Sequence, residues 1–136
     1  MANIWAILVS AIAMMLVGAL WYSKSLFGNH WMSLSGITKE KIQKAKKSGA
    51  VKKSYLVAFL MAVISSYILL AFIEKTGLTS VNGGMTVAFW GWLGFIAANT
   101  AVMYIFELKP IKLYWINALQ SLVAFLVAGA ILGAWA

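Results

Sequence analysis

The sequence predicts an all-α membrane protein: a single four-helix transmembrane domain over residues 1–136, with its helices in an antiparallel bundle. Three observations predict this fold class. Hydrophobic residues make up 63% of the chain and charged residues 10%, whereas ordinary globular proteins have about 45–50% and about 25%. Four apolar stretches are each close to the roughly 20 residues that cross a bilayer core. Lysines are concentrated in alternate connections between these stretches.

The four apolar stretches contain no charged residue and no proline. In hydrocarbon every backbone polar group needs an internal partner, which a helix supplies within its own segment. We therefore expect four membrane-spanning helices. Their predicted bounds are 4–22, 55–73, 85–106 and 113–135.

The lysines indicate how these helices are oriented. Ten of the eleven lysines lie in the connection 23–54 or the short third connection, and only Lys75 lies in the second. Lysine and arginine favour the cytoplasmic side in short loops. The sequence thus predicts both termini outside and the lysine-rich loop 23–54 in the cytoplasm, in what we expect to be a prokaryotic cytoplasmic membrane.

The long connection also predicts a short helix. Thr38 can cap its start, Glu40 falls in the first turn, and Gly49 can end it. Such a helix can contact anionic lipid headgroups or lie solvated at the surface, and both interpretations stay open. No nucleic acid partner is expected, since the chain has no arginine. The predicted headgroup contacts are Lys39, Lys41, Lys44, Lys46, Lys47, Lys52 and Lys53.

Small residues predict where helices pack closely. We expect the run Asn82-Gly83-Gly84 to be a turn before the third span. Within the spans, small residues can close the bundle or join two copies of the chain in a homo-oligomer. The predicted packing residues are Gly91, Gly94, Ala98, Gly129 and Gly133.

Polar residues of the third and fourth spans predict a pocket near the lysine-rich loops. They share helix faces and lie at similar distances from the turn at Pro110. The pocket could bind or conduct a small solute, or its members could hydrogen bond between helices, which is the more common role. The predicted members are Asn99, Thr100, Tyr104, Glu107, Asn117, Gln120 and Ser121.

Glu107 has two interpretations. It can titrate protons or bind a cation, or it can pair with Lys109, Lys112 or Lys24. No catalytic set, metal site or cofactor is predicted, because the chain has no Cys, no Asp and only His30 as a histidine. His30 is expected at the surface.

Several motifs resemble one known family. They are the run Gly18–Ser23, Phe27-Gly28, Trp31, Trp92–Phe95, Phe106-Glu107, Asn117, Gly129 and Trp135. This pattern resembles the small membrane proteins called domain of unknown function 1761, although Pro often follows Trp-Tyr-Ser there and this chain has Lys24. The resemblance implies four helices and no known activity. It draws attention to Trp21, Tyr22, Phe27, Gly28, Trp31 and Glu107 near the inner face. The predicted inner-face cluster is Trp21, Tyr22, Phe27, Gly28, His30 and Trp31.

Three hypotheses for function follow. The first is a non-enzymatic membrane protein, either an accessory or scaffold subunit or a self-associating bundle. The alternative is a transporter or channel for a small solute or ion, using the polar residues of the third and fourth spans. The last is a membrane enzyme with His30, Glu107 and Tyr104 as acid–base candidates.

Overall fold

The computed structural model describes residues 3–136, which are helical with short connections. Four helices are long and apolar enough to cross a membrane. The third is built from three consecutive segments and includes a π-helical stretch. The elements are α1 (Ile4–Trp21), α2 (Gly28–Ser35), α3 (Lys39–Ser48), α4 (Ala50–Thr76), α5 (Val81–Gly91), η1 (Trp92–Ala97), α6 (Ala98–Phe106) and α7 (Ile111–Trp135).

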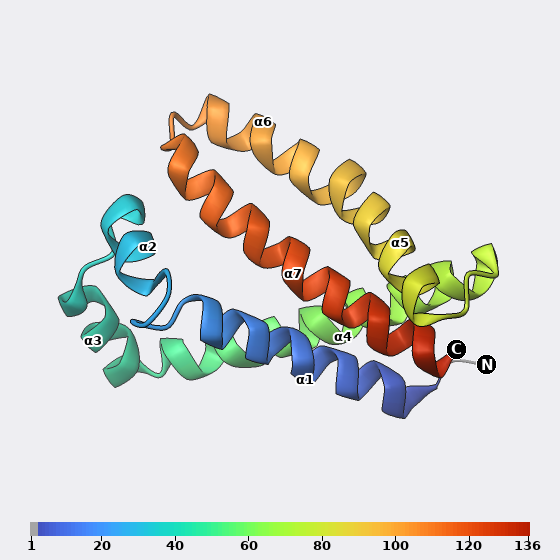
Figure 1. The fold of residues 1–136 in the computed structure, drawn as a ribbon. Coiled ribbons are helices and arrows are strands. Elements are labelled where there is room, and N and C mark those ends of the chain that lie inside the picture. The colour runs from blue at the N-terminus through green and yellow to red at the C-terminus, as the bar shows by residue number, and fades with distance from the viewer. Residues whose placement is uncertain (1–2) are drawn as a thin grey trace.

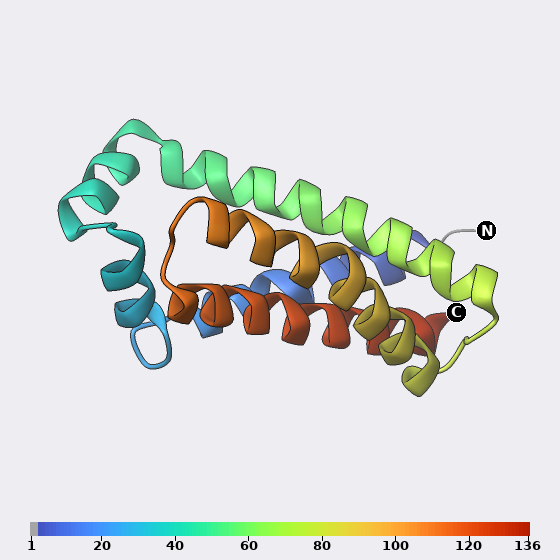
Figure 2. The same ribbon diagram turned by 90° about the horizontal axis from the view of Figure 1, so that it is seen from above.

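The two ends of the helical bundle differ in composition. The start of α1 and the end of α7 lie together at one end, as Figure 1 shows. The short helices α2 and α3 and the turn between α6 and α7 lie at the other end (Figures 1 and 2). We call this the lysine end, because ten of the eleven lysines belong to the segments that meet there.

Polar side chains and glycines define where the helices begin and end. The Thr38 hydroxyl accepts a hydrogen bond from the backbone N–H of Lys41 at 3.2 Å, which caps the start of α3. Gly49, at a φ of 80°, ends α3 and leads directly into α4. Therefore α4 begins several residues before the apolar part of its sequence.

The expected turn at Asn82-Gly83-Gly84 is wrong. Ser80 caps α5 by accepting from the N–H of Gly83 at 2.9 Å, so all three residues lie in its first turn. Both glycines are buried because other backbone comes very close to them. A Cβ on Gly83 would lie 2.3 Å from the carbonyl oxygen of Leu78.

Helix α7 is the centre of the bundle. It contacts α1, α4 and α5, and Figure 2 shows it beneath α4 and beside α5. The closest approach is between α5 and α7, where a Cβ on Gly84 would lie 1.9 Å from the Gly129 carbonyl oxygen. Gly133 makes an equally close approach to the Ser80 carbonyl oxygen, at 2.0 Å from its missing Cβ. These glycines let two backbones touch directly, which gives membrane helices their packing energy.

Buried side chains surround this glycine contact. One apolar cluster joins α1, α4, α5 and α7 toward the end that carries the termini, and it includes Ile7, Leu70 and Leu132. Within it, the Ser10 and Ser66 hydroxyls hydrogen bond at 2.9 Å, and both side chains are fully buried. The pair therefore joins α1 to α4 without leaving a polar group unpaired in an apolar region.

Helix α6 is the least buried segment of the four long helices. It contains no buried residue, and its main contacts are with α7 and η1. Large apolar side chains on it, such as Met103 and Ile105, are more than half exposed. The π-helical segment η1 lies where the well-packed α5 continues into this exposed helix (Figure 1).

Candidate functional site

A hydrogen-bonded cluster of polar side chains joins three helices toward the lysine end. The Tyr22 hydroxyl, at the end of α1, donates to Asn117 Oδ1 on α7 at 2.6 Å. The Asn117 amide nitrogen, Nδ2, donates in turn to the Tyr104 hydroxyl on α6 at 2.7 Å. We call Tyr22, Asn117 and Tyr104 the tyrosine–asparagine cluster. Asn117 is thus its centre, with both ends of its amide occupied.

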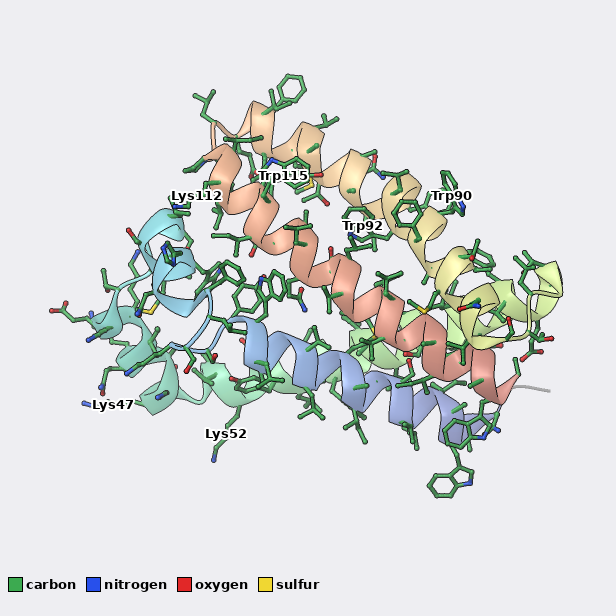
Figure 3. The ribbon with its side chains drawn as sticks, in the orientation of Figure 1. Lys47, Lys52, Trp90, Trp92, Lys112 and Trp115 are labelled. Carbon is green, nitrogen blue, oxygen red and sulfur yellow. The ribbon has the colours of Figure 1, made fainter. Side chains whose placement is uncertain are left out.

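Aromatic side chains extend this set of bonds along α7. Trp21 Nε1 donates to the Ile116 carbonyl oxygen at 2.9 Å, next to the tyrosine–asparagine cluster. Trp92 Nε1 donates to Ser121 Oγ at 2.8 Å. The Trp92 side chain points from η1 toward α7, whereas the side chain of Trp90 points outward (Figure 3). Amphipathic rings can bury their apolar area while one polar atom keeps a partner. These bonds therefore fasten α1 and η1 to α7.

The π-helical turn offers its carbonyl groups to side chains. The carbonyl oxygens of Phe95, Ile96 and Ala97 accept from Asn99, Thr100 and Tyr114, at 3.2, 2.5 and 2.8 Å respectively. A π-helical turn disturbs the regular i to i−4 bonding and is often found near functional positions. Here three carbonyl groups of the turn each accept from a side chain of α6 or α7.

The predicted polar pocket is divided by the structure. Tyr104 and Asn117 meet, and Ser121 meets Trp92 rather than a polar residue of the third span. Gln120 lies toward α1, where its Nε2 is 3.5 Å from the position of a Cβ on Gly18. The Thr100 hydroxyl donates to the Ile96 carbonyl oxygen one turn earlier in the chain, and Asn99 is exposed.

Glu107 lies outside the tyrosine–asparagine cluster. Its carboxylate is 3.4 Å from Lys109 Nζ, and both side chains are about half exposed, at 50% and 43%. Lys109 Nζ also lies 5.1 Å from the centre of the Tyr104 ring. An exposed pair of this kind contributes about 0–1 kcal/mol, so the geometry fits the ion-pair interpretation of Glu107.

The inner-face residues form a compact aromatic corner, except for His30. The rings of Trp21 and Phe27 stack at 4.8 Å, and those of Tyr22 and Trp31 lie 5.5 Å apart. Gly28 starts α2 directly against α1, since a Cβ there would lie 2.5 Å from the Tyr22 carbonyl oxygen. His30 is exposed on α2.

The predicted packing glycines separate into two groups. Gly129 and Gly133 are buried against α5. Gly91 and Gly94 have open space, because a Cβ on either would meet no atom within 4 Å among the described residues. Ala98, the next small residue on this face, is exposed as well.

Three lysines line a cavity at the lysine end. All seven predicted headgroup lysines are exposed. Two of them, Lys39 and Lys46, line a cavity of about 360 Å³ together with Lys24, which the sequence had suggested only as a partner of Glu107. The other five do not line it, and Figure 3 shows Lys47 and Lys52 extending away from the bundle.

The chemistry available in the described residues is limited. Within residues 3–136, every buried side-chain nitrogen or oxygen atom has a hydrogen-bond partner. In the same range no group of three or more His, Asp or Glu side chains could hold a metal ion. The fully buried polar side-chain atoms of these residues are thus all hydrogen bonded.

The sequence of residues 5–133 matches the family described as "Protein of unknown function (DUF1761)". The chain belongs to this family. The resemblance seen in the aromatic and glycine motifs is thereby confirmed. Comparisons with curated proteins and with solved structures found no match. The family description names no activity.

Sequence reasoning missed several contacts. Helical periodicity places residues on faces but gives no register between distant helices, so the bond between Tyr22 and Asn117 could not be predicted. Both residues do belong to the family motifs, which was the available signal. The bonds that Trp92 and Tyr114 each make to a neighbouring helix were missed as well.

Proposed function

We propose that this protein is a non-enzymatic membrane protein that associates with copies of itself through its third membrane-spanning helix. The observation that carries the proposal is the outward face formed by the end of α5, η1 and the start of α6. It combines open small residues with an exposed amide, in a region where most lipid-facing residues are large and apolar. We call Gly91, Gly94, Ala98 and Asn99 the open face.

The amide of Asn99 is the first support. Asn99 lies seven residues before the end of α6, or about 10 Å along the helix axis, and so within the span. Its Nδ2 bonds the Phe95 carbonyl oxygen at 3.2 Å, which leaves other amide atoms without a partner in the exposed side chain. An amide facing lipid is unfavourable, and a hydrogen bond across a helix contact would relieve this.

The shape of the neighbouring surface is the second support. A mostly apolar groove of about 250 Å³ lies between α4 and the third helix, and Gly91, Ile64 and Phe72 line it. Phe95 borders the groove and is 71% exposed. One chain therefore carries both an exposed ring and a recess beside it, which suits the self-complementary surface of a twofold contact between identical copies.

The tyrosine–asparagine cluster argues against transport through one copy of the chain. Its hydroxyls and amide bond each other, while Asn99 and Glu107 lie outside it. The residues predicted to line a solute pocket therefore either bond each other or lie outside the cluster. The simplest role for the cluster is to hold α1, α6 and α7 together.

We also propose that the lysine end faces the cytoplasm, with the helices antiparallel and both termini outside. The count of ten lysines against one supports this orientation. The chain has no cysteine, so single-cysteine variants at Lys47 and at Leu78 can be labelled from either side of intact cells. Labelling of position 47 from outside would reverse the assignment.

Self-association is tested by energy transfer between labelled copies in liposomes of neutral lipid. Asn99→Leu should weaken association about 3- to 30-fold, because a hydrogen bond between membrane helices contributes about 0.6–2 kcal/mol. Gly94→Leu should weaken it further by filling the open face. Ala19→Leu, an exposed small-to-large change on α1, is the matched control and should have no effect. Equal association of all four proteins would refute the proposed interface.

A further inference from the structure

The cavity at the lysine end is built from four consecutive parts of the chain. It lies among the end of α1, the connection after it, α2 and α3, and has a volume of about 360 Å³. It is independent of the open face. The residues that line it are Tyr22, Lys24, Gly28, Asn29, Trp31, Met32, Lys39, Ile42, Gln43 and Lys46.

The charges around this cavity have one sign. Lys24, Lys39 and Lys46 line it, and no Asp or Glu does. The ion pair between Glu107 and Lys109 is the one salt bridge formed within residues 3–136, so none of the three lysines is paired there. Like charges that share a cavity repel each other, and an anion between them would turn that repulsion into attraction.

Helix α3 divides its lysines between two faces. Lys39, Ile42, Gln43 and Lys46 follow the i, i+3, i+4, i+7 spacing of one helical face, and all four line the cavity. Lys44 and Lys47 lie on other faces and are exposed. Lysines that line the recess are thus separated from lysines of the same helix that do not line it.

Uncharged donors complete the lining. Asn29 and Gln43 contribute amide groups, and Trp31 contributes a ring with an N–H. Ammonium and amide N–H groups are the donors that oxygen-rich anions accept from. The walls are held in place from the bundle side, because Gly28 and Trp31 pack on Tyr22, which in turn bonds Asn117.

We propose that this cavity binds a phosphate group. Its lysines supply the charge, and its amides supply directed donors. The cavity is adjacent to the end of a membrane-spanning helix, where the phosphate of an anionic lipid headgroup would lie, and a soluble phosphate compound would meet the same groups. The proposal concerns the shared phosphate chemistry and does not rest on self-association.

The test uses the full chain in neutral nanodiscs and measures binding by microscale thermophoresis. One arm titrates dihexanoyl phosphatidylglycerol, and the other titrates inorganic phosphate and pyrophosphate. Saturation in the first arm alone identifies a lipid headgroup, and saturation in the second identifies a soluble phosphate compound. Either result supports the site. No saturable binding in either arm would overturn it.

Two triple variants distinguish binding in the cavity from attraction to the overall positive charge. The cavity variant carries Lys24→Gln, Lys39→Gln and Lys46→Gln. The control carries Lys44→Gln, Lys47→Gln and Lys52→Gln, so both lose the same charge and both replace exposed side chains. The cavity variant should bind at least tenfold more weakly, whereas the control should change less than threefold. An equal loss in both variants would show that only net charge matters and would refute the site.

Discussion

The contact between α5 and α7 makes opposite predictions for two glycines of the same helix. Gly84 is buried, and a Cβ there would lie 1.9 Å from the carbonyl oxygen of Gly129. Real Cβ contacts shorter than 3.0 Å essentially never occur, so the two backbones must move apart by about 1.1 Å. Gly91, two turns later on α5, has no atom within 4 Å of its missing Cβ.

The expected energies follow from this difference. Overpacking a tight contact costs about 1–3 kcal/mol, and separating the helices also weakens the contact around Gly133. An alanine in a helix interior gains roughly 0.5–1 kcal/mol over glycine. Gly84→Ala should therefore lower the free energy of unfolding by about 1–2 kcal/mol. Gly91→Ala should leave it unchanged or raise it by up to about 1 kcal/mol.

The assay is reversible unfolding in mixed micelles by titration with a denaturing detergent, followed by circular dichroism. Both variants make the same chemical change on one helix, so each controls for the other. Destabilisation by Gly84→Ala alone supports the close contact of α5 and α7. If both variants have the same stability, the two backbones do not touch at Gly84 and the packing described here is wrong.

Two further predictions concern polar side chains that hydrogen bond between helices. Asn117→Leu should destabilise the protein by about 1–3 kcal/mol, since it removes two hydrogen bonds and leaves two tyrosine hydroxyls unpaired. With Tyr22→Phe already present, the added cost of Asn117→Leu should fall, and a double-mutant cycle showing simple additivity would contradict direct contact. Ser10→Ala and Ser66→Ala should each cost about 1 kcal/mol or more. The double variant should lose less free energy of unfolding than the sum of the two single variants, because both serines share one hydrogen bond. A loss equal to that sum in the same unfolding assay would contradict the bond.

Much of the fold could be predicted from sequence because lipid imposes a simple rule. A backbone in hydrocarbon must satisfy its own polar groups, so uncharged apolar stretches of the right length become helices. Four helices long and apolar enough to cross a membrane are found accordingly. Helices α4 and α5 begin before their apolar stretches, because Gly49 and Ser80 set their first residues and hydrophobicity does not.

Contacts between helices were harder to predict. Gly84 was interpreted as part of a turn because an Asn-Gly-Gly run is typical of turns. In the structure, the missing side chain of Gly84 lets the backbone of α7 come close to α5. Asn99 was grouped with Asn117 by position along the span, but the π-helical segment before it and the exposed side of α6 place it outside the cluster. The cavity with Lys24 depends on how α2 and α3 fold back, and that arrangement has no signature in local sequence.

The central proposal is that the third helix joins copies of this chain. Native mass spectrometry of the protein, gently extracted from its own membrane, tests it most directly. We predict a homo-oligomer without a second protein, which dissociates to monomers when the chain carries both Gly94→Leu and Asn99→Leu. A monomer, or a stoichiometric complex with a different membrane protein, would contradict the proposal.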